Sequence, residues 1–416
     1  MNNQHGLNTR PRAGRETAAD RRDRARLIAA ETVEIARRGS YEYRGRTVEF
    51  AEAQRLSEQS SELITPERGA EILRRFGGSG AVIAGTNSYA SEMLETGKIS
   101  CEQSGADDEA EEAEEAKARF EETGKDESSA EEAEEAKAEI DEAEVGGPQA
   151  GSLAVEAARR IDARGEAGRE QPRASAADRA PEAREAAKDR PASAVDKPLR
   201  ARTDFRVANE SAVKTVRDLY AAGSRQIGVL NFASAKNPGG GFLNGAMAQE
   251  ESLAASSGLY AAQLRHPEYY RANKRCGSMI YTHHAIYTPD AVFFRDERFE
   301  LAAEPAAASV LTLPAVNYGQ VLLKGENAEL AKAAMLERMR LALAIFAERG
   351  VRALVLGAYG CGIFGNDPAE VASWWRRLLD GEGFASYFDE IVFAVLDRSR
   401  SEENIRPFER IWGRAL

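Results

Sequence analysis

The stretch "VLNFASAKNPGGGFLNGAMAQEES", residues 229–252, decides the fold. It begins in an apolar run, 226–232, that predicts a strand, and it ends in an Ala-rich run, 251–264, that predicts a helix. Between them stand Gly239, Gly240 and Gly241. Three residues without a Cβ permit positive φ and let backbone N–H groups come close to a ligand. Two interpretations remain open: a flexible loop, or a loop that binds a ligand through its backbone.

A second glycine-rich loop, "GAYGCGIFGNDP" at 357–368, has the same context. It follows a predicted strand over 351–359 and precedes a predicted helix over 368–379. Its glycines match G-x-G-x-x-G, the pattern of a phosphate-binding turn at a helix N-terminus. A Rossmann domain opens with such a loop and continues through several strand–helix units. Only about 50 residues follow here, so we expect a phosphate-binding loop on another α/β fold.

Two adjacent glutamates, Glu250 and Glu251, close the first loop. Helical neighbours diverge by about 100°, so we expect the two side chains not to point at the same atom. Acidic residues also favour a solvated helix start, which is the alternative interpretation of the pair. Next to a triple-glycine loop, the pair favours a cleft with phosphate-binding backbone and one or two carboxylates. Such a cleft suits glycosidic chemistry on a nucleotide sugar.

The remaining periodicity alternates strands and helices. Further strands are predicted at 278–288, 291–295, 309–316 and 388–396, and further helices at 211–222 and 327–349. Near the N-terminus the pattern predicts a helix over 17–38, a turn and short strand over 39–50, and a helix to about residue 60, with a strand and helix also conceivable at 80–94. Alternation of this kind predicts a layered α/β sandwich around a largely buried sheet.

The charge of the chain is concentrated in one segment. The 416 residues carry a net charge of −12, yet residues 101–145 alone hold 20 acidic and 4 basic residues, so the remainder is mildly basic. "AEEAEEAKA" occurs at 110–118 and again at 130–138, and large apolar residues are scarce from 101 to 200. Such a segment cannot offset the entropy of ordering, which predicts disorder or an isolated solvated helix. It is either a tolerated insertion in a surface loop or an acidic interaction segment.

Other features narrow the class of protein. Three widely spaced cysteines, no apolar leader and no apolar run near ~18 residues predict a soluble, cytoplasmic protein without a membrane span. No dense basic stripe indicates a direct nucleic-acid partner, no cluster indicates a metal, and no cofactor is expected. His283 and His284 are expected to be packed or surface residues, and Cys361 a small side chain that fills its loop. The three tryptophans are expected to pack on helices. Tyr269 and Tyr270 are expected to pack in the core, with stacking on adenine as the alternative.

Both glycine-rich loops together resemble a known family. "PGGG" at 238–241 followed after seven residues by "QEE" at 249–251, with "VLGAYGCGIFGNDPAEVA" later in the chain, is similar to microbial-type poly(ADP-ribose) glycohydrolases. The resemblance covers roughly 203–396, more weakly 17–60, and leaves out 101–200. It implies a macrodomain-like, three-layer α/β/α sandwich with a mixed sheet, interrupted by a long low-complexity insertion. The implied domains are an N-terminal part of the catalytic domain (17–100), the insertion (101–200) and the catalytic core (203–416).

The resemblance also implies roles for residues. Glu251 would be the catalytic acid and base, and Glu250 would bind ribose hydroxyls at the scissile linkage. The predicted substrate-binding residues are Asn231, Gly239, Gly240, Gly241, Gln249, Gly360, Gly362, Ile363, Phe364 and Gly365. The glycines of the first loop would line the cleft near ribose and diphosphate, the second loop would hold the diphosphate, and Phe364 would position the distal ribose.

The implied reaction is hydrolysis of ribose–ribose O-glycosidic bonds in poly(ADP-ribose), with polymer or ADP-ribosylated protein as substrate and an unspecified oligomeric state. A non-catalytic ADP-ribose reader, a mono-ADP-ribosyl hydrolase and an interaction protein acting through its acidic segment are the alternatives. Two departures from the family bear on affinity: Ala254 and Ala255 stand where a larger or basic residue is expected. Ser234 stands where many macrodomains carry a ribose-binding Asn.

Overall fold

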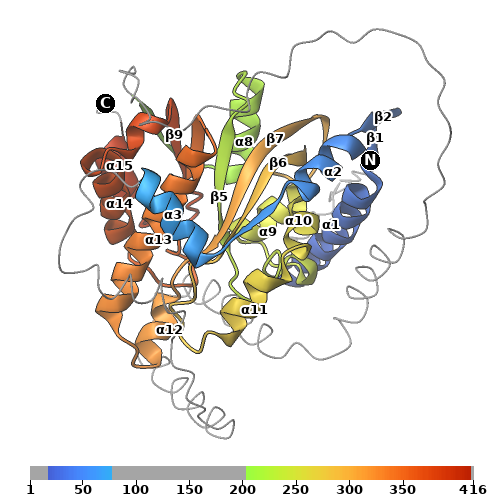
Figure 1. The fold of residues 1–416 in the computed structure, drawn as a ribbon. Helices are drawn as coiled ribbons and strands as arrows, with labels where there is room; N and C mark the ends of the chain where they lie inside the picture. The colour runs from blue at the N-terminus through green and yellow to red at the C-terminus, as the bar shows by residue number, and fades with distance from the viewer. Residues whose placement is uncertain (1–16, 77–202, 414–416) are drawn as a thin grey trace, which may run out of the picture. The chain divides into compact units, whose positions relative to one another are not determined.

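A computed structural model describes residues 17–76 and 203–413, and its main feature is a seven-stranded mixed sheet (Figure 1). The strand order is β3-β6-β7-β5-β8-β9-β4. Pairing is antiparallel from β3 to β7 and parallel from β7 to β4. The strands are β3 (Glu62–Ile64), β4 (Asp204–Ala208), β5 (Ile227–Ala233), β6 (Ala285–Arg295), β7 (Leu301–Pro314), β8 (Ala353–Leu356) and β9 (Glu390–Ala394), with a separate hairpin of β1 (Ser40–Tyr43) and β2 (Arg46–Glu49).

Helices cover both faces of the sheet (Figure 1). They are α1 (Ala18–Arg38), α2 (Ala51–Gln59), α3 (Pro66–Phe76), α8 (Ala212–Ala221), α9 (Gln249–Ser256), α10 (Leu259–Leu264), α11 (Pro267–Arg275), α12 (Tyr318–Leu323), α13 (Ala328–Glu348), α14 (Pro368–Arg376) and α15 (Arg406–Trp412). Alternate residues of β5 divide between two cores, since Leu230 packs with α3, α13 and α14 while Val229 packs with α8, α9 and α10. The predicted three-layer α/β/α sandwich with a mixed sheet is therefore confirmed.

Several predicted boundaries were wrong. The strand expected at 309–316 is β7, which begins eight residues earlier at Leu301. The strands expected at 278–288 and 291–295 are one strand, β6, which starts only at Ala285 and continues through a register shift between Thr288 and Ala291. Such a bulge interrupts the alternation of side chains that sequence patterns rely on. The helix expected over 251–264 starts earlier, at Gln249, and breaks at Ser257.

The helix break has a packing cause. Ser257 is extended and forms a bridge with Phe293 of β6, and the N–H of Gly258 donates to the carbonyl of Val292. A Cβ on Gly258 would overlap the amide of Gln54 in α2. The sheet and α2 thus take the backbone out of the helix at this point, and α10 continues in a new direction.

The N-terminal segment is part of the same fold. Ile64 of β3 and Ile72 of α3 are fully buried in the core that α13 and α14 share. The expected turn and short strand at 39–50 is a two-stranded hairpin, and the sequence patterns missed β3, α3, β4, α11, α12 and α15. These elements are three to eleven residues long, too short for a periodic signal to stand out.

Some predictions lie outside the described residues. The elements conceivable at 80–94 and the character of 101–200 fall within 77–202, so both remain predictions. Among residues 17–76 and 203–413, no helix is both long and apolar enough to cross a membrane.

Gly228, near the start of β5, offers a test of core packing. A Cβ on Gly228 would lie 2.8 Å from ring atoms of Phe346 and from Val351, both buried. We expect Gly228→Ala to lower the free energy of unfolding by about 1–3 kcal/mol, because overpacking shifts those side chains. Urea denaturation measures this. Gly277→Ala, whose Cβ would meet nothing within 4 Å, is the matched control; an equal effect in both variants would contradict the argument.

Candidate active site

Three neighbouring parallel strands end at one edge of the sheet. β7, β5 and β8 are adjacent and parallel, so the loops that follow them are brought together there. The loop after β5 carries the triple glycine, and the loop after β8 carries the second glycine motif. In open α/β sheets this edge is where ligands bind. The structure thus joins two loops more than 100 residues apart in sequence.

Glu250, in the first turn of α9, is buried against the end of β5. Its side chain is 3% exposed. The amides of Asn231 (3.0 Å) and Gln263 (2.9 Å) both donate to its Oε1, and the N–H of Ser234 donates to its Oε2 at 2.6 Å. Three donors on one carboxylate fix its orientation.

Glu251 points into the glycine loop. Its Oε1 accepts a 2.8 Å hydrogen bond from the N–H of Gly241, and the residue is 8% exposed. A Cβ on Gly240 would overlap Glu251 Oε1 and lie 3.0 Å from Glu250 Oε2, and Gly240 has φ +59°. The glycine is therefore needed both for its backbone conformation and for the space that the two carboxylates occupy.

As expected, the two glutamates do not share a partner: Glu250 accepts from Asn231, Gln263 and Ser234, and Glu251 accepts from Gly241. Both carboxylates nevertheless lie against Gly240, an approach that helix geometry alone did not predict. A glutamate has two flexible carbons beyond Cβ, and the bare loop backbone admits both side chains to the same small space. The 100° rule governs where side chains leave a helix rather than where long ones end.

Burial raises the pKa of both carboxyls. For Glu250, desolvation and the nearby charge of Glu251 raise the pKa to about 8, against the opposing effect of its three donors. For Glu251, desolvation raises the pKa, and the backbone N–H groups of the loop and of the helix start oppose it. A raised pKa suits a carboxyl to general acid catalysis, because the group more readily carries the proton that it donates.

Neighbouring residues hold α9 in place. The side-chain amide of Gln249 pairs with the β5 backbone, accepting from the N–H of Phe232 and donating to the carbonyl of Leu230, both at 2.9 Å. Gln249 thereby joins the helix start to the strand; the substrate contact predicted for it stays a prediction. Ser234 Oγ accepts from the N–H groups of Lys236 and Asn237 and shapes the turn that leads to the glycines.

The small residues Ala254 and Ala255 have a structural explanation. Both are buried in a cluster with Ala29 of α1 and Phe242 of the first loop. A larger side chain would separate α1 from α9, so their size follows from helix packing.

The second loop is held by Asn366. Its Nδ2 donates to the carbonyls of Val316, after β7, and Gly360, at 2.8 and 2.9 Å. Gly360 and Gly365 have φ of +74° and +66°, and the N–H of Gly319 donates to the carbonyl of Phe364. The loop is thus tied to the ends of both β7 and β8. Its predicted ligand residues divide by exposure: Phe364 packs 6.3 Å from the ring of Tyr281, whereas Ile363 is 46% exposed.

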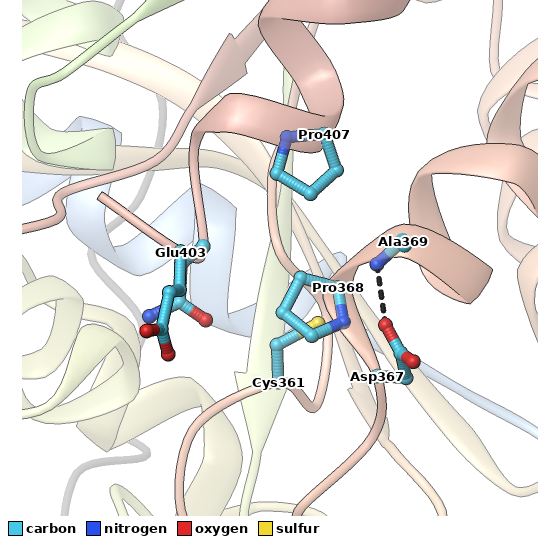
Figure 2. A pocket seen from close by; sticks show the side chains of 7 residues that line it. Cys361, Asp367, Pro368, Ala369, Glu403 and Pro407 are labelled. Carbon is cyan, nitrogen blue, oxygen red and sulfur yellow. Dashed lines mark hydrogen bonds between the residues drawn. The ribbon is translucent and has the colours of Figure 1, made fainter. Parts of the chain in front are cut away.

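A cavity of about 500 Å³ borders this loop (Figure 2). Its walls come from the loop, the start of α14 and the segment leading into α15; they are Cys361, Asp367, Pro368, Ala369, Glu403, Asn404 and Pro407. Asp367 caps α14 by accepting from the N–H of Ala369 at 2.7 Å. Neither Glu250 nor Glu251 lines the cavity, and its two carboxylates disfavour a phosphate group. Cys361 contributes a thiol whose pKa burial raises, which makes it a poor nucleophile.

The remaining aromatic and histidine side chains pack as expected. Tyr269 and Tyr270 are buried, and Trp375 is fully enclosed in the core. Burial lowers the pKa of His283 to about 3, so its ring is neutral. Among residues 17–76 and 203–413, no group of three or more His, Cys, Asp or Glu side chains is arranged to hold a metal.

Sequence patterns missed Gln263 and Thr312, which also belong to this site. Gln263 interrupts the apolar run of α10, and Thr312 stands within the apolar run of β7; both are fully buried. A polar residue inside an apolar run is a weak signal that was available in the sequence.

Comparison with known proteins agrees with the geometry. Residues 29–296 match the family "Microbial-type PARG, catalytic domain". The crystal structure of poly(ADP-ribose) glycohydrolase from Thermomonospora curvata is similar at 29% identity and a TM-score of 0.62, over 93% of this chain and 99% of that one. The same enzyme bound to the inhibitor ADP-HPD matches at 28% and 0.61, with the same coverage. The Deinococcus radiodurans enzyme in complex with ADP-ribose is 40% identical over 50% of this chain and 83% of that one, with a TM-score of 0.48. Comparison with curated proteins gave no match.

The raised pKa of Glu250 predicts a pH dependence of stability. Between about pH 4.5 and pH 8, the folded state holds a proton that the unfolded state has lost, so stability falls as pH rises. We expect the free energy of unfolding of wild type, relative to Glu250→Gln, to decrease by up to about 1.4 kcal/mol per pH unit in this window. Denaturant titrations from pH 4 to 9 measure the difference. A difference independent of pH would show that Glu250 is ionised throughout.

Proposed function

The chain belongs to the microbial-type poly(ADP-ribose) glycohydrolase family, and from this premise we propose that Glu251 is the acid and base that cleaves ribose–ribose bonds of poly(ADP-ribose). As a member of the family it is a glycosidase-type hydrolase. The observation that carries the proposal is the state of Glu251: it is buried, its Oε1 is held by Gly241, and its pKa is raised. A buried carboxyl with a raised pKa, held by one oxygen at the glycine loop, is suited to donate a proton to a substrate in that loop.

Cleavage begins with proton donation. Protonated Glu251 donates to the glycosidic oxygen of the leaving ribose as the bond from that oxygen to the anomeric carbon breaks. The electron pair of the bond goes to the oxygen, and the anomeric carbon becomes oxocarbenium-like. Negative phosphate oxygens of the substrate itself lie near this centre and stabilise it.

Hydrolysis restores the enzyme. The Glu251 carboxylate takes a proton from water while the water oxygen bonds to the anomeric carbon, which leaves a hydroxyl on each product. One carboxyl serves as acid and then base, where most glycosidases divide the two tasks. Glu250 accepts hydrogen bonds from ribose hydroxyls and sets the sugar in line with Glu251.

The two glycine-rich loops bind the substrate in this proposal. Gly239, Gly240 and Gly241 bring bare backbone next to the carboxylates, where the ribose has to lie for the proton transfer. The loop from Gly360 to Gly365 presents backbone N–H groups for the diphosphate. Ile363 and Phe364 complete the proposed substrate-binding set. Asn231 and Gln249, for which substrate contacts were also predicted, are occupied by Glu250 and by the β5 backbone and act on the substrate through the residues that they hold.

The proposal extends to the partners of the protein and to its location in the cell. Poly(ADP-ribose) or ADP-ribosylated proteins are the proposed partners, without direct nucleic-acid binding. A cytoplasmic location stays a prediction, which the three widely spaced cysteines support. The domain division, with 101–200 as an insertion in the catalytic domain, stays a proposal as well.

Replacing the proposed acid tests the reaction directly. We expect Glu251→Gln to lower the rate of ADP-ribose release from poly(ADP-ribose) by about 10²–10⁴-fold, because the amide cannot donate and retake the proton. The amide oxygen still accepts from Gly241, so ADP-ribose affinity should stay close to that of wild type. Release is measured by chromatography and affinity by calorimetry.

Other results of this experiment would contradict separate parts of the proposal. A folded wild type that binds ADP-ribose without releasing any would be a reader rather than a hydrolase. A Glu251→Gln variant with unchanged release would move the chemistry to another group. Glu62→Gln, in the edge strand β3, is a control for loss of one glutamate.

The second loop is tested through affinity. A Cβ on Gly360 would lie 2.6 Å from Asn366 Nδ2 and 2.7 Å from Ala315, in a backbone conformation that disfavours alanine. We expect Gly360→Ala to displace the loop and weaken ADP-ribose binding by about tenfold or more. Gly381→Ala, whose Cβ meets nothing within 4 Å, is the control. Unchanged affinity in Gly360→Ala would place the diphosphate elsewhere.

A further inference from the structure

We propose that Gln263 and Thr312 are positioning residues that hold Glu250 in one orientation, so that a single oxygen of its carboxylate faces the substrate. Glu250 is the residue proposed above to bind ribose hydroxyls, and the inference rests on that function. Neither Gln263 nor Thr312 reaches solvent, since both are fully buried. They therefore act through Glu250.

The geometry is a closed set of four hydrogen bonds. Asn231 Nδ2 donates to Glu250 Oε1 (3.0 Å) and Thr312 Oγ1 (3.2 Å). Gln263 Nε2 donates to the same two oxygens, at 2.9 and 3.3 Å. A side-chain amide has two N–H bonds, so both amides use all their donors on this pair of acceptors. Each acceptor in turn receives two donors.

This arrangement decides which oxygen is available. Glu250 Oε1 accepts from two amides and has no capacity left, whereas Oε2 accepts only from the N–H of Ser234. One hydrogen-bonding position on Oε2 remains for a ligand: it donates to a ribose oxygen when the carboxyl is protonated and accepts from a hydroxyl when it is ionised. Oε2 is also the oxygen that lies beside Gly240 and hence beside the glycine loop. Glu250 thus presents one oxygen in one direction.

The orientation of the amides follows from the carboxylate and the hydroxyl. Turning either amide over would place its oxygen against Glu250 Oε1. In the observed orientation Asn231 Oδ1 and Gln263 Oε1 are buried without a hydrogen-bond partner among the described residues. Burying an oxygen without a hydrogen-bond donor is unfavourable, so a packing role alone would favour apolar residues at these positions. The need to hold the Glu250 carboxylate explains why Asn231 and Gln263, and not apolar residues, occupy these positions.

The sheet supplies the other half of the support. Asn231 and Thr312 are direct neighbours across the parallel β5–β7 pair, on the face that α9 and α10 cover. The break between α9 and α10 turns Gln263 back toward this pair. Thr312 Oγ1, on the sheet, therefore accepts hydrogen bonds from both amides, and both amides donate to Glu250.

A double-mutant cycle separates positioning from packing. We expect Gln263→Met to lower kcat/KM for ADP-ribose release by about 10- to 100-fold, since a misplaced contact at the reacting sugar is costly. In a Glu250→Ala background the same substitution should change kcat/KM by less than about threefold, because the group that it acts through is gone. The same cycle is measured on ADP-ribose affinity by calorimetry, which covers variants with very slow release.

Thr312 has matched variants. Thr312→Val removes only the hydroxyl and should lower kcat/KM by about tenfold, whereas Thr312→Ser restores an acceptor and should recover most of the loss. Thr215→Val removes another fully buried hydroxyl, on α8, and should change stability without changing kcat/KM. Thermal unfolding of every variant shows whether it is folded.

The outcomes keep the two proposals apart. A wild type that releases no ADP-ribose overturns the proposed function, and this inference with it. A wild type that is active, with equal Gln263→Met effects in both backgrounds, overturns the positioning role alone. Equal activities of Thr312→Val and Thr312→Ser would do the same.

Discussion

The parallel pairing of β5 with β7 on one side and β8 on the other is the constraint on which the site depends. Parallel neighbours end at the same edge, so this pairing brings the two glycine-rich loops together. The same register places Asn231 beside Thr312, and this pair of strand residues supports the carboxylate of Glu250. Antiparallel pairing at either position would send one loop to the opposite edge. The proposed chemistry therefore begins with strand direction.

Two carboxyls share a small, dry space, and this decides their protonation. A helix N-terminus and donated N–H groups favour the charged form, while burial favours the neutral one. For both Glu250 and Glu251 burial prevails and the pKa rises. Gly240 is what allows this, because any side chain there would force at least one carboxylate out of the space. The triple glycine is thus as much a steric condition for the glutamates as a possible ligand loop.

The sequence predicted the buried strands more accurately than the positions at which neighbouring elements interrupt a strand or a helix. The buried strands at 353–356 and 390–394 lie within the predicted ranges, and the strand at 227–233 differs from the predicted 226–232 by one residue at each end, because apolar runs bounded by loops carry a clear signal. The start of β6 and the break between α9 and α10 escaped it, since both are set by neighbours: a bulge against β7, and the approach of α2 at Gly258. The approach of both carboxylates to Gly240 escaped it for a related reason, because helix geometry alone leaves out the glycine loop against which both side chains lie.

By itself, the sequence determined the α/β class, the two loops, the Gln-Glu-Glu motif and the family to which these features point. Those properties are local: apolar periodicity, glycine spacing and adjacent acidic residues are written along a short segment. Only the tertiary structure decided that the loops adjoin, that burial raises the pKa of both glutamates, and that Gln263 and Thr312 support one of them. These properties depend on distances between residues far apart in the chain and on the exclusion of water, which arise only when the sheet and its helices pack together.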